Sequence, residues 1–184
     1  MHAIYKREMK SYFTSPIGYI VCSVMLLLLG LYFSYMYRNN YTNISFVFMS
    51  ISTIALLVCP IITMRLLSED KRQKVDQLLL TAPVKLWKII YGKFFAALTL
   101  FMLPFAMTFI YVFILMLSTS VNWLAFLADL LGIALLGSSI LAIGLFISAL
   151  TESQIIAGIF GIVVSFFIMQ IDYFSQSVDA TWFT

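Results

Sequence analysis

The sequence predicts an all-α membrane protein, a polytopic helix bundle that forms one transmembrane domain over residues 1–184. Hydrophobic residues make up 62% of the chain and charged residues only 10%, whereas soluble domains carry roughly 25% charged residues. The chain also contains five long apolar runs, and a helix needs about 20 apolar residues to cross a bilayer core of about 30 Å. A soluble fold of this length does not bury so much apolar side chain, but a bilayer does.

The five predicted spans cover residues 17–37, 46–64, 94–117, 123–150 and 154–171. The first is too long for the apolar part of a signal peptide and ends without a small-residue cleavage site, so we expect it to be retained. Pro104 is expected to kink the third span. Small residues at four-residue spacing in the last two spans predict close helix packing, either within one chain or at a dimer seam. They are Ala134, Ser138 and Ala142, then Ala157, Gly161 and Ser165.

Cationic residues predict the orientation of these spans. Residues 1–16 and 65–93 together hold ten of the eleven Lys and Arg residues, and the remaining one is Arg38. Because cytoplasmic loops are enriched in Lys and Arg, we expect residues 1–16 and 65–93 and the turn 151–153 in the cytoplasm. The prediction is a multi-pass protein of the cell membrane with a cytoplasmic N-terminus.

The N-terminal residues 1–16 are predicted to form an amphipathic helix. Tyr5, Met9, Tyr12 and Phe13 share one face, and lysines lie on another. Such a helix lies in the membrane interface, with aromatic rings among the headgroups and lysines near anionic lipid. Membrane lipid is therefore an expected partner. A plain basic topology anchor is the alternative that the pattern leaves open.

The loop 65–93 is the largest polar segment. Ser68 is expected to cap a short helix, with Glu69 and Asp70 favourable in its first turn and Arg72 after them. An apolar stripe of Val75, Leu78 and Leu79 follows, and Pro83 ends the helix. The stripe fits a groove on a soluble partner or a lipid surface equally well.

Sequence motifs for catalysis are missing. The chain has no G-x-x-x-x-G-K-[ST], H-E-x-x-H or G-x-S-x-G motif. Its only histidine is His2, and Cys22 and Cys59 both lie in apolar runs, which is typical of packing residues. We therefore expect no enzyme and no catalytic, metal or cofactor site in this chain. Asp129, an acid within the fourth run, is a candidate for contact with a substrate or the mark of an interfacial segment.

Three sequence blocks together resemble the permease subunits of ABC-2-type ABC transporters, and they span nearly the whole chain. They are KREMKSYFTSPIGY at 6–19, MRLLSEDKR at 64–72 with LLLTAPV at 78–84 and GKF at 92–94, and LAIGLFISALTESQ at 141–154. The resemblance is nearest to the subgroup that includes the gliding-motility and the nitrous-oxide-reductase maturation permeases. The family pattern implies six spans, so with five spans this chain is expected to be a fragment or to be cut short before a sixth.

The resemblance also implies partners. A second permease copy and two cytoplasmic ATP-binding subunits are expected, with ATP and Mg²⁺ held by those subunits and not by this chain, and no nucleic-acid partner is expected. The loop after the second span would dock on the ATP-binding subunit, and the turn near Thr151 and Glu152 would make a second contact. The function expected is the permease of an ATP-driven exporter. The alternatives are a membrane anchor or mechanical and signalling subunit coupled to an ATPase, and a stand-alone channel.

Overall fold

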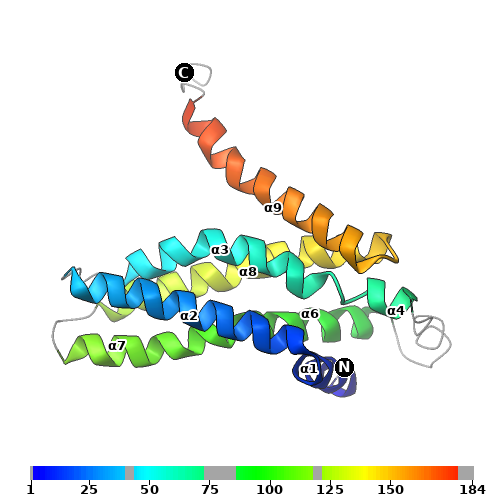
Figure 1. The fold of residues 1–184 in the computed structure, drawn as a ribbon, viewed down its shortest axis with the longest axis horizontal. Helices are drawn as coiled ribbons and strands as arrows, with labels where there is room; N and C mark the ends of the chain where they lie inside the picture. Colours follow the sequence, from blue (N-terminus) through cyan, green and yellow to red (C-terminus); the bar gives the residue numbers. More distant parts are fainter. Residues whose placement is uncertain (1, 40–43, 73–85, 118–121, 178–184) are drawn as a thin grey trace.

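The computed structural model of this chain describes residues 2–39, 44–72, 86–117 and 122–177, and its described secondary structure is helical. The helices run along the long axis of the molecule, except for α1, which is seen almost end-on, and α9, which diverges from the bundle (Figure 1). They are α1 (His2–Thr14), α2 (Pro16–Arg38), α3 (Ser45–Thr63), α4 (Ser68–Arg72), α6 (Leu86–Met102), the 3₁₀ turn η1 (Pro104–Met107), α7 (Thr108–Met116), α8 (Trp123–Leu150) and α9 (Gln154–Ser177). The predicted all-α membrane bundle is confirmed.

Among the described residues, four segments are long and apolar enough to cross a membrane: Pro16–Arg38, Ser45–Thr63, Trp87–Met116 and Trp123–Leu150. They correspond to the first four predicted spans. The fifth predicted span lies in α9, where the apolar stretch recognised among the described residues is the shorter Gln154–Ile168. The predicted count of five spans is therefore approximate.

The third span differs from the prediction at its start. α6 begins at Leu86, about two turns before residue 94, so the aromatic stretch after Pro83 continues directly into the span. Its other predicted feature is confirmed, because the helix is broken by η1, which begins at Pro104 and separates α6 from α7. Proline has no N–H for the helical ladder, so a break at this position is expected.

A tight corner joins α1 to α2. The Ser15 hydroxyl accepts a hydrogen bond from the Ile17 N–H at 3.2 Å, and Pro16 occupies the first position of α2, where a missing N–H costs nothing. A Cβ atom at Gly18 would lie 2.5 Å from the Tyr12 carbonyl oxygen. Glycine thus allows α1 to fold back closely across the start of α2.

The aromatic face of α1 packs on protein. Tyr12 is 4% exposed, and its hydroxyl donates to the Ile62 carbonyl of α3 at 2.9 Å. The Tyr5 hydroxyl donates to Thr99 Oγ1 of α6 at 3.2 Å. The expectation that the aromatic rings lie among lipid headgroups is therefore wrong for Tyr12. Placement of α1 in the membrane interface stays a prediction.

Glycines, and not the predicted small-residue stripe, make the close contacts of α8. A Cβ atom at Gly137 would lie 2.2 Å from the ring of Phe101, and one at Gly144 would lie 2.2 Å from Thr63 Oγ1. Ala142, a member of the predicted stripe, is exposed. The predicted stripe is therefore not the face of α8 that packs within the chain, where the glycines lie at a similar spacing. The alternative of a dimer seam stays a prediction.

The predicted stripe of α9 does form a close contact. Ala157, Gly161 and Ser165 are buried, and a Cβ atom at Gly161 would lie 2.9 Å from the Cβ of Pro60 in α3. Of the two alternatives, packing within one chain accounts for this face.

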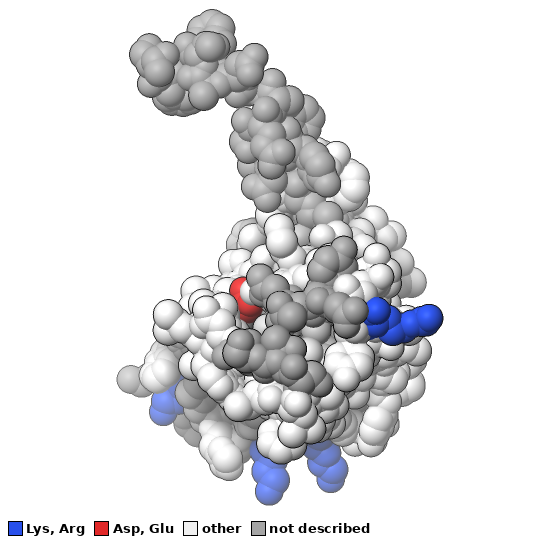
Figure 2. Space-filling view, turned by 90° about the vertical axis from the view of Figure 1, so that its left-hand side faces the viewer, with Lys and Arg blue, Asp and Glu red and all other residues white. Residues whose placement is uncertain are grey.

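Large apolar side chains cover the outside of the bundle. Leu124 is 80% exposed and Phe113 is 65% exposed, as suits a surface that lies in lipid. Figure 2 looks onto the end where α2 ends and α8 begins, and the described surface there is mostly uncharged, with the visible Lys and Arg groups at its rim.

Candidate functional site

Polar elements gather at one end of the bundle, which we call the α4 end. α1, α4, the start of α6 and the junction of α8 with α9 all lie there (Figure 1). α1 packs against α6 and α2, and α4 contacts both α8 and α9. Segments far apart in the sequence thus form one surface.

Four charged side chains form the ionic cluster of this end: Arg7, Glu8, Asp70 and Lys93. Lys93 Nζ lies 3.0 Å from Glu8 Oε1 and 2.8 Å from Asp70 Oδ2. It also donates to the Leu66 carbonyl at 2.5 Å. Arg7 Nη2 lies 2.7 Å from Glu8 Oε1 and 3.6 Å from Asp70 Oδ2. The cluster joins α1, α4 and α6 through a single ammonium group.

Burial makes each charge of the ionic cluster depend on its partners. Lys93 is 1% exposed and Glu8 is 9% exposed, and a buried charge is tolerated only when it is paired and hydrogen-bonded. The Arg7 side chain is 45% exposed. Burial lowers its pKa, but the hydrogen bond and charge of Glu8 and the charge of Asp70 outweigh burial, so the pKa of Arg7 is raised. Arg7 is therefore cationic, and its partly exposed side chain lies between the buried charges of the cluster and the solvent.

One oxygen of the Asp70 carboxylate accepts no hydrogen bond from the described residues. Its contact with Lys93 is an ion pair without hydrogen-bond geometry, and Asp70 Oδ2 is a buried atom with no hydrogen-bond donor among the described residues. The ion pair with Lys93 is therefore the contact that links Asp70 of α4 to α6.

A second set of bonds ties α4 to the end of α8. Ser148 Oγ accepts hydrogen bonds from the backbone N–H groups of Leu67 and Ser68, each at 3.1 Å. The Lys71 ammonium donates to the Ala149 carbonyl. One serine of α8 therefore satisfies backbone donors at the start of α4, which otherwise have no helical partner.

The predicted docking residues that are described lie near one another. Ser68 is fully buried, and Asp70 belongs to the ionic cluster. Thr151 Oγ1 donates to the Ser153 carbonyl at 3.3 Å, and Glu152 is exposed. Because α4 is bonded to Ser148 and Ala149, the loop and the turn predicted to dock form parts of one surface.

The capping role expected of Ser68 is wrong. Ser68 is the first residue of α4 and not the residue before it, and its hydroxyl donates to the Met64 carbonyl one turn earlier. Glu69 and Arg72 lie in α4, but their side chains are outside the described part of the structure. Val75, Leu78 and Leu79 lie wholly outside the described residues.

The sequence interpretation missed Glu8 and Lys93 as site residues. Lys93 was counted as a loop cation, whereas it lies in α6. Glu8 is the only acid in residues 1–16, but no sequence pattern pairs it with a lysine 85 residues away.

Polar groups within the spans bond mainly to their own helices. Ser50, Ser52, Thr99 and Thr108 donate to carbonyl groups three or four residues earlier. Asp129 accepts a hydrogen bond from Ser45 Oγ at 2.5 Å, which ties α8 to the start of α3. These bonds account for the polar side chains without assigning a substrate path.

The similarity of the chain to known proteins lies at the level of a family. Neither the curated proteins nor the solved structures gave a significant match. The family model described as "ABC-2 type transporter" matches residues 1–182. Members of this family are membrane permeases that associate with an ATP-binding subunit. With four segments in its described part that can span a membrane and a family match over almost all of its length, the chain is a multi-pass membrane protein of the ABC-2 type transporter family.

Proposed function

We propose that this chain is the permease subunit of an ATP-driven exporter in the cell membrane and that separate cytoplasmic ATP-binding subunits dock on its α4 end. The observation that carries the proposal is the anchorage of α4 to three other helices, to α1 and α6 by the ionic cluster and to α8 by Ser148. The residues proposed to form or support the docking surface are Ser68, Glu69, Asp70, Arg72, Val75, Leu78, Leu79, Thr151 and Glu152. Ser68 is buried and would contribute by holding α4 in place.

The proposed mechanism is a change of helix packing driven from α4. ATP favours the closed form of the paired ATP-binding subunits, and a ligand shifts an equilibrium toward the state that it binds better. Displacement of the docked loop is passed to α6 through Lys93 and to α8 through Ser148. Rigid helices joined by a few polar contacts move as units, which opens a path between two permease copies.

The basic residues support a cytoplasmic location of the α4 end. Arg7, Arg65, Lys71 and Lys93 all lie there. A complex of two permease copies and two ATP-binding subunits follows from the family pattern. The three sequence blocks further support a place near the gliding-motility and nitrous-oxide-reductase maturation permeases.

A site-specific cross-link tests the docking surface. A photoreactive amino acid at Glu152, which is exposed at the α4 end, is compared with one at Leu124, which is 80% exposed near the opposite end. We expect an adduct with an ATP-binding subunit from position 152 only. Adducts of equal yield from both positions, or none from 152 in active membranes, would overturn the docking proposal.

A further inference from the structure

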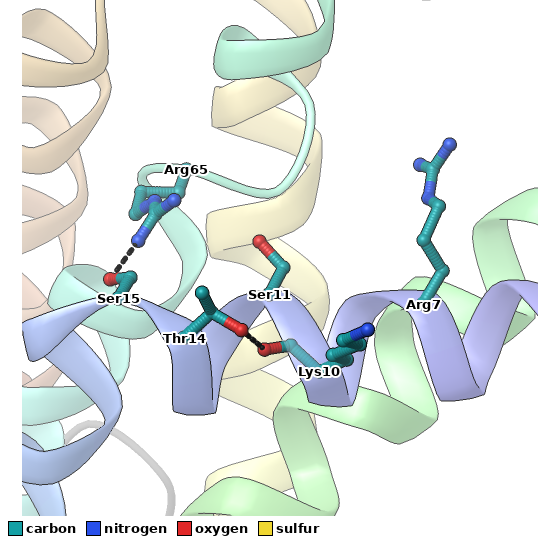
Figure 3. Close-up of a pocket in the computed structure, with 6 residues that line it drawn as sticks. All are labelled: Arg7, Lys10, Ser11, Thr14, Ser15 and Arg65. Carbon is teal, nitrogen blue, oxygen red and sulfur yellow. Dashed lines mark hydrogen bonds between the residues drawn. The ribbon is translucent and has the colours of Figure 1, made fainter.

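A shallow groove lies between α1 and the chain that leaves α3. It has a volume of about 400 Å³ and is lined by Arg7, Lys10, Ser11, Thr14, Ser15 and Arg65. Figure 3 shows these side chains along α1, with Arg65 reaching over Ser15 from the facing segment. The groove is separate from the exposed turn at Glu152 that the docking proposal uses.

The lining combines positive charge with hydroxyl groups. Among the described lining residues, Arg7, Lys10 and Arg65 are cationic and none is acidic. Glu8, which lies 2.7 Å from Arg7, is 9% exposed and is also paired with Lys93. The described lining therefore offers cationic groups to an anion.

Two internal bonds hold the lining in place. Arg65 Nη1 donates to Ser15 Oγ, and Thr14 Oγ1 donates to the Lys10 carbonyl at 2.7 Å. Guanidinium and ammonium groups beside hydroxyl donors are the groups that bind phosphate oxygens in proteins. The chemistry of the groove thus fits a phosphate group.

We propose that this groove binds the phosphate of an anionic phospholipid headgroup. A lipid is favoured over a soluble phosphate by the surroundings of the groove. α2 starts directly beyond Ser15, and its first outward residues, Tyr19 and Ile20, are 60% and 57% exposed. A headgroup in the groove would leave acyl chains free to lie along this apolar face, as basic pockets beside membrane helices allow.

The test uses the purified protein, delipidated in mild detergent. Native mass spectrometry measures the binding of added phosphatidylglycerol and of phosphatidylcholine. We expect preference for phosphatidylglycerol, and we expect the Lys10→Gln/Arg65→Gln double variant to raise its Kd about tenfold or more. Lys6→Gln removes one cation from an exposed position of α1 outside the groove, and it should change the Kd by less than about twofold.

Competition with inorganic phosphate distinguishes a lipid headgroup from a soluble phosphate as the ligand of the groove. Retention of the bound lipid in millimolar inorganic phosphate supports the lipid site. If inorganic phosphate displaced the lipid, and phosphate binding depended on Lys10 and Arg65 in the same way, the groove would be a site for a soluble anion. This result would overturn the lipid proposal. Arg65 also bonds Ser15, so its replacement changes the groove itself. The single variant Lys10→Gln, at an exposed position, is therefore measured too, and an unchanged Kd for this variant would overturn the proposal.

Discussion

Lys93 of α6 lies with its Nζ atom 3.0 Å from Glu8 Oε1 of α1, although 85 residues separate them in the chain. The same Nζ atom contacts Asp70 of α4 at 2.8 Å. A single buried ammonium therefore sets the position of the crosswise N-terminal helix and of α4 relative to a membrane span. This contact is the structural basis for coupling α4 to the bundle.

Removing the Lys93 charge should destabilise the protein strongly. Lys93→Met leaves Glu8 and Asp70 without their buried partner, and breaking a buried ion pair in this way costs about 3 to 5 kcal/mol. Thermal unfolding in detergent measures the loss. The control is Lys88→Met on the same helix, where Lys88 lies over the Trp87 ring at 5.7 Å. Equal unfolding temperatures for the two variants would contradict the role of the cluster.

Ser148→Ala should loosen α4 without disturbing the spans. The change removes the acceptor shared by the Leu67 and Ser68 N–H groups, and an unsatisfied buried donor costs about 1–3 kcal/mol. Hydrogen exchange at these two amides should become faster. Ser139→Ala removes only an exposed bond within α8 and serves as the control. Unchanged exchange at both amides would mean that Ser148 does not anchor α4.

Gly144→Ala should lower the free energy of unfolding by about 1–3 kcal/mol, because the new methyl group would meet Thr63 in a packed contact. Gly132→Ala on the same helix is the matched control, since a Cβ atom there has no neighbour within 4 Å. Helix propensity alone makes that change neutral or stabilising. If both variants lost stability equally, the close packing of α8 on α3 would be contradicted.

The double variant Leu78→Asp/Leu79→Asp should uncouple ATP hydrolysis while leaving the helices inserted. These leucines form the apolar stripe that the sequence predicts for the docking loop, and two carboxylates there oppose burial against a partner. The control is Gln73→Asp/Gln77→Asp, which adds the same charge off the stripe. Normal ATP-driven activity of the leucine variant in reconstituted membranes would exclude docking through the stripe.

The sequence predicted the spans better than it predicted their contacts. α8 was predicted with its observed bounds, because apolar length is a one-dimensional signal. The start of α6 was misplaced, because Lys93 was taken as the edge of a loop and its counter-charges come from α1 and α4. A buried pair cannot be recognised until tertiary packing brings the two segments together.

Packing faces were predictable only in part. The small residues of α9 were assigned correctly as a close-packing face, whereas in α8 the spacing of Ala134, Ser138 and Ala142 competed with that of Gly137 and Gly144. Both sets have helical periodicity, and only the partner helices α3 and α6 decide which is buried. The joining of α4 to the end of α8 was likewise not predictable, because it depends on two tertiary contacts, at the Ser148 hydroxyl and at the Ala149 carbonyl.

The most direct test of the central claim is co-purification from the native host in mild detergent, with native mass and ATPase activity measured on one sample. The account predicts a complex of two copies of this chain with two ATP-binding subunits, which hydrolyses ATP. A chain that purifies alone from membranes in which it is functional, with no associated ATPase activity, would contradict it.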